Sequence, residues 1–498
     1  MTPCAWWSRW IRCTATRPAR CRRKASPASS PSSTRGSRSN LGALTAPPKS
    51  IARQLFRLAV PIIGINVLHV SMLAVDLAMC GRLPNSEVAL SALGYATQIV
   101  FLLVIVMAGL TVGTVALVSR AYGAGDTERV NHLLTQAAQL TAIVGVTIGC
   151  LGAVLAGPIL RAIGASEPAV AVGVEYLRPL MLSTPFFYFS LLYAGVLRGV
   201  GNTRIPFQCA LVASVINLVL VYGLVLGKLG MPALGVSGAA IGTVIAQMCN
   251  VTMLVVTLRR GVVANLVLRF RLQRIDPGLT KELFRVGWPA ALDVVILNAA
   301  ALGALAMLSR IDQITVAAHG LGLRVQTLAF VPGLGISMAT GAMVGQALGA
   351  GDVARAREVT RASMRLCIVI MSTLALAIVA AAYPVLQVFD VTRGSQLEDY
   401  AVQAMRILAL SMIPAALSIS LNGLFQGSGS TWTSLRINVW TTLAIHIPLA
   451  YVLAFAFDLG ALGVWLSFPF AFVAKSVFSY VAYRQENWAI TGTRVRPK

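Results

Sequence analysis

The chain has 498 residues, of which 57% are hydrophobic and only 12% are charged, whereas an ordinary soluble domain carries about 25% charged residues. So much apolar sequence cannot be covered by a water-facing surface, which excludes a soluble globular protein. The net charge of +24 would suit nucleic-acid binding, but most basic residues lie in an N-terminal segment and in short loops between apolar runs, a pattern typical of the cytoplasmic face of a membrane protein.

The first 50 residues differ from the rest of the chain. They contain ten basic and no acidic side chains and are rich in serine, proline and threonine. Such a segment cannot bury enough apolar surface to offset the entropy lost on ordering. We therefore expect residues 1–50 to form a disordered basic tail.

The remaining sequence contains about twelve runs that are long and apolar enough to cross a membrane, since a transmembrane helix needs about 20 apolar residues. Their approximate limits are 55–80, 90–118, 134–157, 169–193, 206–227, 236–258, 284–308, 315–345, 362–386, 399–424, 433–457 and 461–483.

Basic residues are distributed unevenly over the connections between these spans. The even-numbered connections hold sixteen Lys and Arg residues and the odd-numbered connections hold five. Because positively charged loops stay in the cytoplasm, we expect the even-numbered connections and both termini to be cytoplasmic.

The two halves of the chain repeat one another. Three landmarks recur at offsets of 228, 226 and 228 residues: Pro61 and Pro289, Gly125 and Gly351, and Gly199 and Gly427. Each half has six spans, an even number, so both halves insert in the same orientation and are related by a pseudo-two-fold axis along the membrane normal.

This pattern predicts an all-α polytopic membrane protein built from two six-helix bundles with a central cleft between them. The N-terminal bundle would cover residues 51–258 and the C-terminal bundle residues 284–483. Residues 259–283 form a basic cytoplasmic linker, and residues 484–498 a cytoplasmic tail.

Several kinds of chemistry are missing from the sequence. It has no GxxxxGK[ST] motif, so this chain cannot bind ATP through a P-loop, and uphill transport would need an ion gradient or a partner chain. It has no HExxH motif, and the eight cysteines show no paired spacing, so we expect no metal site and no disulfide framework. The four histidines are far apart in sequence: His69, His132, His319 and His446.

Of the seventeen acidic residues, fifteen lie in loops or near the ends of the predicted spans; the exceptions are Asp76 in the first span and Asp293 in the seventh. A charge at membrane depth costs at least ~2.5–3.5 kcal/mol and usually faces a cavity or a partner. The functional interpretation is a proton or cation site for Asp76, with Asp293 as a second site. The alternatives are a carboxylate that caps a helix or pairs with an arginine and, for Asp76, an interfacial carboxylate exposed to water.

Two further polar residues inside the predicted spans, His69 and Asn217, are candidates for a role near Asp76. His69 lies two helical turns before Asp76 on the same face, where it could tune the site, although a simple hydrogen bond is the preferred interpretation. Asn217 in the fifth span offers either an oxygen ligand for a cation or a hydrogen bond between helices.

Five short motifs follow one another along the spans: VDLAMCG at 75–81, LVSRAYGAGD at 117–126, LRGVGNTR at 197–204, AAHG at 317–320 and MVGQALGAGD at 343–352. In this order they resemble the motifs of the MATE (multidrug and toxic compound extrusion) family. The resemblance covers about residues 51–485, with Asn202 at a position where the family usually has Asp.

The resemblance implies a secondary antiporter of the bacterial inner membrane and not an enzyme. It would expel small amphipathic, often cationic, organic compounds in exchange for H⁺ or Na⁺ by alternating access between the two bundles. No cofactor is expected besides the transported ion. The expected partners are substrates and membrane lipids, without nucleic acid, and the expected state is a monomer.

The resemblance also assigns site residues. The first-helix aspartate is a coupling residue in the family, which carries over to Asp76. Asn217 matches an asparagine, and Thr243 a threonine, of the same pocket, whereas Val221 stands where many relatives have a further Asp.

The positions at which the NorM-type branch carries acids correspond here to Leu297 and Ala415. Neither residue can bind an ion through a side-chain carboxylate. The resemblance is therefore to the DinF-like branch, with a site in the first bundle and H⁺ as the expected ion.

Two alternatives remain open. A lipid-linked oligosaccharide flippase of the same superfamily would need several arginines around a pyrophosphate, and bases are scarce inside the spans. A non-transporting membrane scaffold or receptor would not need membrane-embedded acids.

Overall fold

The computed structural model describes residues 50–490 except 84–85, 262–272, 388 and 390. The predicted tail 1–50, apart from Ser50, the central part of the linker 259–283 and the end of the tail 484–498 lie outside the described residues. The described helices are α1 (Ile51–Cys80), α2 (Ser86–Gly123), α3 (Thr127–Ala162), α4 (Glu167–Leu182), α5 (Thr184–Gly199), α6 (Arg204–Leu226), α7 (Val236–Arg259), α8 (Pro277–Leu308), α9 (Gln313–Gly349), α10 (Val353–Ala380), α11 (Ala382–Gln387), α12 (Gln396–Gly427), α13 (Thr431–Val439), α14 (Ile447–Tyr451), α15 (Gly460–Arg484) and α16 (Asn487–Ile490).

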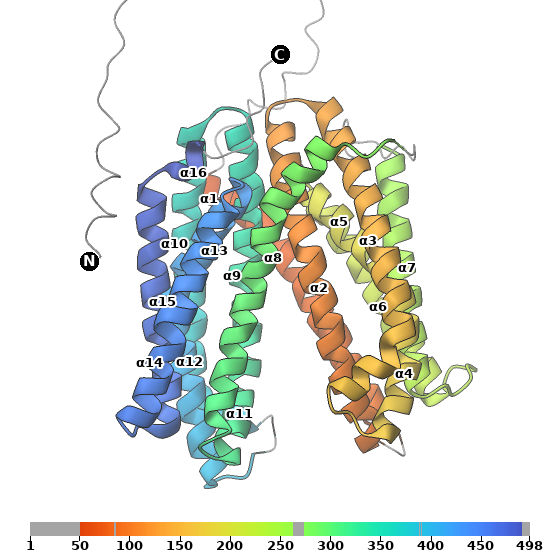
Figure 1. The fold of residues 1–498 in the computed structure, drawn as a ribbon, viewed down its shortest axis with the longest axis vertical. Coiled ribbons are helices and arrows are strands. Elements are labelled where there is room, and N and C mark those ends of the chain that lie inside the picture. The colour runs from red at the N-terminus through yellow and green to blue at the C-terminus, as the bar shows by residue number, and fades with distance from the viewer. Residues whose placement is uncertain (1–49, 84–85, 262–272, 388, 390, 491–498) are drawn as a thin grey trace, which may run out of the picture. The chain divides into compact units, whose positions relative to one another are not determined.

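The predicted number of spans is confirmed. Eleven described helices, counting 431–456 as one, are long and apolar enough to cross a membrane, and the bent pair α4 and α5 makes a twelfth span. We call the end of the molecule at which α1 begins and α15 ends the terminal end, which is the upper end in Figure 1, and the opposite end the far end.

Two spans are less regular than the sequence suggests. The fourth is broken at Ser183, where α4 and α5 meet at an angle of 50°. Pro185 explains the break because it has no N–H to donate to the preceding turn and it restricts the residue before it. The eleventh widens into π-helical turns at Trp440–His446 and Val452–Ala456, and Pro448 leaves one carbonyl group in the first of these turns without its usual donor.

The two GAGD motifs have the same local structure. Gly125 and Gly351 adopt left-handed conformations, with φ of +74° and +76°, which glycine adopts without steric cost. Each following aspartate, Asp126 or Asp352, then caps the next helix by accepting a hydrogen bond from a backbone N–H three residues on. The motifs therefore encode the turns from α2 to α3 and from α9 to α10.

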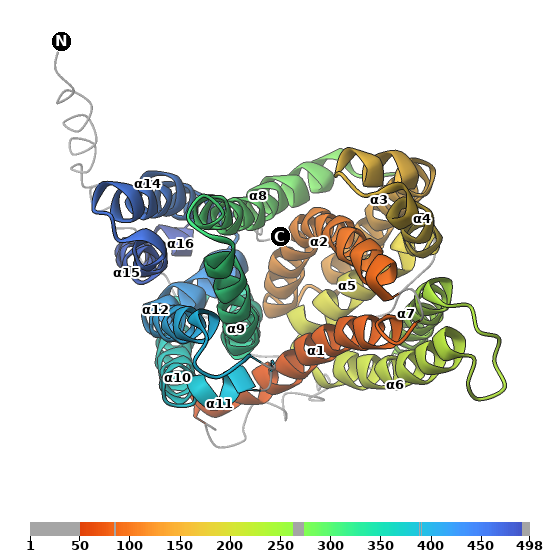
Figure 2. The same cartoon turned by 90° about the horizontal axis from the view of Figure 1, so that it is seen from below.

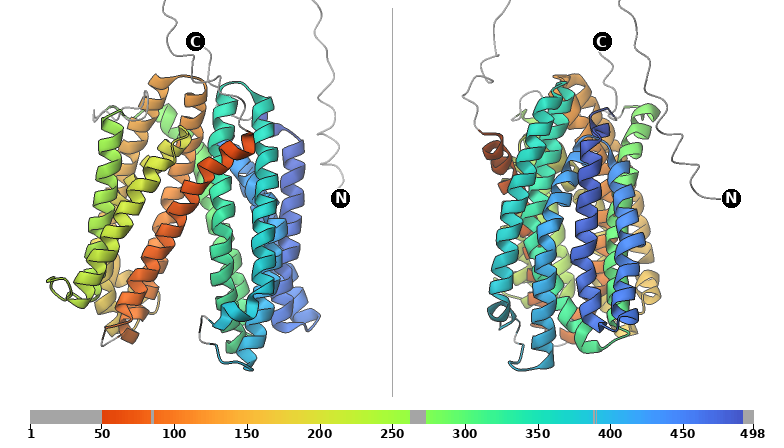
Figure 3. Two further views of the ribbon diagram at one scale, coloured as in Figure 1. Left: turned by 180° about the vertical axis from the view of Figure 1, so that it is seen from behind. Right: turned by 90° about the vertical axis from the view of Figure 1, so that its left-hand side faces the viewer.

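The helices form two lobes (Figure 2), an N lobe (α1–α7) and a C lobe (α8–α15). In Figure 2, α1 and α8 lie on opposite sides and each runs from one lobe to the other. Figure 3 shows α1 beside α10 at the terminal end and beside α6 at the far end.

The lobes exchange the first halves of α1 and α8. Leu55, Ala59 and Ile62 belong to the buried core of the C lobe, whereas Cys80, at the other end of α1, belongs to the core of the N lobe. The first half of α8 enters the N-lobe core in the same way through Leu279 and Leu283. Because lipid tails are as apolar as leucine, close packing of these side chains stabilises the arrangement, and their removal from water does not.

Candidate functional site

Asp76 is buried near the far end of α1, with 4% of its surface exposed. Its Oδ2 accepts a hydrogen bond from the hydroxyl of Tyr176 on α4 at 3.2 Å and lies 3.3 Å from the hydroxyl of Thr243 on α7. No ion pair with Asp76 occurs in the part of the chain that the structure describes. The carboxylate is therefore neither an exposed interfacial group nor half of a salt bridge with arginine.

The predicted residues Asn217 and Thr243 join the same site. The amide nitrogen of Asn217 on α6 donates to the Thr243 hydroxyl at 3.0 Å, and this hydroxyl in turn donates to Asp76. Asn217 is almost fully buried, at 1% exposed. Four helices of one lobe, α1, α4, α6 and α7, thus meet through a continuous chain of hydrogen bonds.

Two oxygens of this site lack a donor. Oδ1 of Asp76 and Oδ1 of Asn217 are both buried, and neither accepts a hydrogen bond from the described residues. Buried acceptors are nearly always satisfied in folded proteins. A proton on Asp76 Oδ1 would remove the carboxylate charge, and a hard monovalent cation would suit an environment of carboxylate, amide and hydroxyl oxygens.

Sequence reasoning missed Tyr176. It lies 100 residues from Asp76, and no spacing rule joins a tyrosine of the fourth span to the first. Its only sequence signal is a hydroxyl in an apolar run, where a buried tyrosine usually finds a polar partner. The bend at Ser183 helps to set the direction of α4.

Asp293 is also buried, at 6% exposed, but both of its oxygens have partners. The side-chain amide of Asn438 donates to Oδ1. The Ser434 hydroxyl lies 3.2 Å from Oδ2 and 3.0 Å from Asn422 Oδ1, and its single proton can be donated to only one of them. These contacts lie within the C lobe, so the structure does not bring Asp293 into the site of Asp76.

The structure does not bring His69 into the site by hydrogen bonding. His69 is partly buried on α1, and no hydrogen bond or ion pair with Asp76 is found for it among the described residues. Nor do the described residues contain a group of three or more His, Cys, Asp or Glu side chains that could hold a metal ion.

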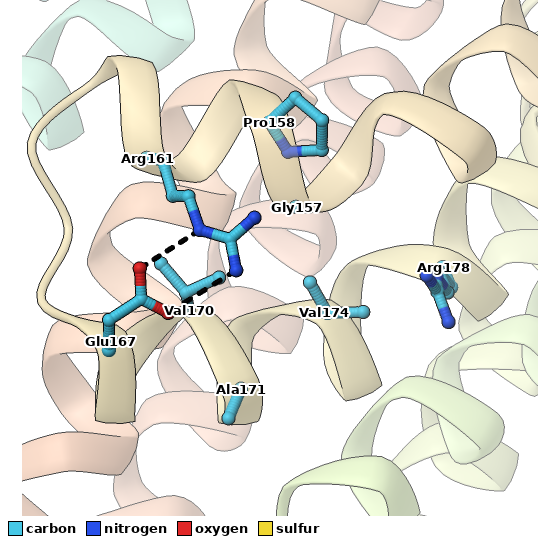
Figure 4. Close-up of a pocket in the computed structure, with 8 residues that line it drawn as sticks. All are labelled: Gly157, Pro158, Arg161, Glu167, Val170, Ala171, Val174 and Arg178. Atoms are coloured by element: carbon cyan, nitrogen blue, oxygen red, sulfur yellow. Dashed lines mark hydrogen bonds and ion pairs between the residues drawn. The ribbon is translucent and has the colours of Figure 1, made fainter.

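Two cavities lie away from Asp76. One, of about 290 Å³, lies between α3 and α4 and includes Arg161, Glu167 and Arg178 in its lining; Figure 4 shows the two bonds, of 2.9 and 3.3 Å, between Arg161 and Glu167. The other, of about 40 Å³, lies between the lobes, and Arg198 is the only charged residue in its lining.

Comparison with known proteins agrees with this architecture. The family model described as MatE matches twice, over residues 61–223 and 289–452. The starts of the two matches are 228 residues apart, the same offset as Pro61 and Pro289, so the internal repeat lies within the family itself. The AAHG and VDLAMCG motifs both lie inside these matches.

Similar proteins cover almost the whole chain. The "Probable multidrug resistance protein YoeA" of Bacillus subtilis is 26% identical over 87% of this chain and 94% of its own length. The "Probable multidrug resistance protein NorM" of Thermotoga maritima is 26% identical over 88% of this chain and 93% of its own length. A crystal structure of MATE in the bent conformation is 22% identical, with a TM-score of 0.81 over 88% of this chain and 95% of that one.

The matched segments begin at the proline that opens the first span of each lobe and extend into the fifth span of each, so they include Asp76, Tyr176 and Asn217. The fold, the internal repeat and the family match thus agree over both lobes. The chain belongs to the MATE family of membrane transporters.

Proposed function

We propose that the protein is a secondary antiporter that exports small amphipathic, often cationic, organic compounds across a bacterial inner membrane in exchange for H⁺. Three observations support this proposal: the family, the multidrug resistance names of its relatives and the lack of a P-loop in this chain. The excess of basic residues in the even-numbered connections supports a cytoplasmic position for the terminal end.

The observation that carries the proposal is the open oxygen of Asp76. A carboxylate that is held by two hydroxyls on Oδ2, and whose Oδ1 has no hydrogen-bond partner in the described part of the chain, is anchored in position yet able to accept an ion. Burial disfavours its charged form, whereas contact with water or a cation favours it. Such a group can load H⁺ when the site opens to one side and release it when the site opens to the other.

In the proposed cycle the two lobes rock about the pseudo-two-fold axis. With the site open to the outside, Asp76 takes up the ion and the substrate leaves. With the site open to the cytoplasm, the ion leaves and a new substrate binds. Ion and substrate must then bind antagonistically, and this antagonism is necessarily reciprocal.

We further propose that the coupling site is of the DinF-like kind and lies in the N lobe. Acids at the NorM-type positions are replaced by Leu297 and Ala415. Asp293, each of whose oxygens has a donor side chain of the C lobe within hydrogen-bond distance, fits a structural role better than a second ion site.

A lipid-linked oligosaccharide flippase is less well supported. Recognition of a pyrophosphate would require several converging basic groups, and the described cavity between the lobes has a single arginine, Arg198. A non-transporting scaffold would leave the open oxygen of Asp76 unexplained.

The test is efflux of a fluorescent cationic dye from loaded cells that express the protein at matched levels. Asp76→Asn keeps the shape of the side chain but cannot take up and release a proton, so efflux should fall to that of cells without the protein. Glu167→Gln, an exposed acid at the far end, is the control and should transport normally. Undiminished efflux by Asp76→Asn would refute the assignment.

A further inference from the structure

Two polar side chains cross between the lobes at the terminal end. Arg120, near the end of α2, donates through Nη2 to the backbone carbonyl of Ser428 at 2.8 Å. Gln346, near the end of α9, donates through Nε2 to the backbone carbonyl of Gly199, also at 2.8 Å. Each bond therefore runs from a helix of one lobe to the backbone of the other.

The two bonds are related by the internal repeat. Arg120 and Gln346 lie 226 residues apart, and their acceptors Gly199 and Ser428 lie 229 apart. The donors thus occupy equivalent positions of the repeat, and Ser428 lies one residue after Gly427, the equivalent of Gly199. The same sequence motifs, near 117–126 and 343–352, supply both donors.

Both acceptors sit at the C-terminal end of a helix. Gly199 is the last residue of α5, and Ser428 is the C-cap of α12. Carbonyl groups there have no partner within the helix and carry the negative end of its dipole. A guanidinium is a stronger donor to such a group than a neutral amide, so the bond from Arg120 should be the stronger of the two.

The backbones beneath these side chains are in close contact. A Cβ atom added to Gly123 would overlap the carbonyl of Gln346, and one added to Gly349 would overlap the carbonyl of Arg120. These two glycines also lie 226 residues apart. The terminal ends of α2 and α9 can approach this closely only because both positions lack a side chain.

We propose that these two bonds form a clasp, made by Arg120 with Ser428 and by Gln346 with Gly199, that closes the terminal end and sets the balance between the two access states. This proposal rests on the alternating-access cycle proposed above. When the lobes separate at this end, both bonds must break and the close glycine contacts must open. The strength of the clasp then determines how often the terminal end opens.

The clasp is tested by measuring the distance between the lobes directly, in nanodiscs and without any ion gradient. Spin labels carried by p-acetylphenylalanine at Glu128 and Ala354, two exposed positions at the terminal end of α3 and α10, report this distance by double electron–electron resonance. Because the label does not use cysteine, the native cysteines remain in place.

We expect Arg120→Ala to raise the ratio of separated to closed lobes by on the order of tenfold, and Gln346→Ala by a smaller factor. Arg120→Lys keeps a charged donor and should restore most of the closed population. Arg357→Ala is the matched control because its ion pair with Glu486 stays within the C-terminal half of the chain.

Distance distributions identical to wild type in folded, monodisperse Arg120→Ala and Gln346→Ala would overturn the clasp. Gly349→Ala provides an independent variant, because it blocks the close contact sterically without removing either donor; it should also favour separated lobes. The readout needs no transport, so a shifted distance together with absent dye flux would refute the antiport proposal and leave the clasp standing.

Discussion

Asp76 and Asp293 are both buried, but their carboxylate groups differ in their hydrogen bonding. Asp76 has two hydroxyl donors on Oδ2 and an Oδ1 without a partner among the described residues, whereas each oxygen of Asp293 lies within hydrogen-bond distance of a donor side chain. A carboxylate with every oxygen bonded is held in place, and one with an open oxygen can exchange an ion. We infer that burial alone does not mark the coupling residue.

Removing the Tyr176 hydroxyl tests this interpretation. Tyr176→Phe loses one of the two donors that position Asp76, and hydrogen bonds to charged groups contribute about 1.5–3 kcal/mol. The initial rate of dye efflux should therefore fall by about tenfold, without the complete loss expected for Asp76→Asn.

Tyr188→Phe is the matched control for this measurement. Tyr188 is also buried in the same lobe, but its hydroxyl donates to the Leu103 carbonyl at 3.0 Å and not to Asp76. Equal effects of the two substitutions would mean that Tyr176 serves only the packing of the lobe.

For Asp293 we expect substitution to lower the stability of the protein and to leave the ion dependence of transport in place. Asp293→Ala removes both acceptor oxygens and leaves the buried amide of Asn438 without its acceptor, so the free energy of unfolding should fall by about 1–3 kcal/mol. Thermal unfolding of the purified protein should show a lower midpoint, while the dependence of dye flux on the imposed H⁺ gradient should remain. Loss of ion dependence with unchanged stability would identify Asp293 as a second ion site.

At the scale of elements, α1 and α8 couple the two lobes. Each begins in the core of one lobe and ends in the core of the other, so rocking of the lobes must bend or tilt these two helices. Pro61 and Pro289 lie near the positions where they change lobes. Proline weakens the helix locally by removing a hydrogen bond, which makes these positions suitable hinges.

The crossing of α2 and α8 depends on glycine. A Cβ atom at position 287 would lie 2.5 Å from the carbonyl oxygen of Gly109, so Gly287→Ala must push two backbones apart. We expect the free energy of unfolding to fall by about 1–3 kcal/mol, as in other overpacked sites. Gly320→Ala on α9 is the control because nothing lies within 4 Å of the added carbon.

For Gly320→Ala we expect the free energy of unfolding to stay the same or to rise slightly, in contrast to its fall in Gly287→Ala. Alanine favours the helix over glycine by up to about 1 kcal/mol, so this variant should be as stable as wild type or slightly more stable. A Gly287→Ala variant that unfolds at the wild-type temperature would show that the α2–α8 crossing is looser than its geometry implies.

For the whole molecule, much of the architecture follows from one-dimensional patterns. The number of spans follows from apolar length, and the repeat from three landmarks at one offset, because these properties need no knowledge of which helices touch. The clustering of Asn217 and Thr243 with Asp76 came from family motifs and not from spacing. Their role in transport stays a prediction.

Other features of the molecule depend on packing in three dimensions. The contact of Tyr176 with Asp76 requires the bend at Ser183 and a particular rotation of α4. The bonds of Arg120 and Gln346 require two helix ends to meet across the lobes. Neither can be inferred from periodicity, because hydropathy does not specify how helices are rotated or which neighbours they meet.

The most direct test of the account is dye transport in proteoliposomes with independently imposed H⁺ and Na⁺ gradients. With an acidic interior and no Na⁺ gradient, the wild-type protein should accumulate a cationic dye, whereas Asp76→Asn should give the flux of protein-free vesicles. Dye uptake by Asp76→Asn at the wild-type rate, with the same dependence on the H⁺ gradient, would contradict the claim that Asp76 exchanges the ion for the substrate.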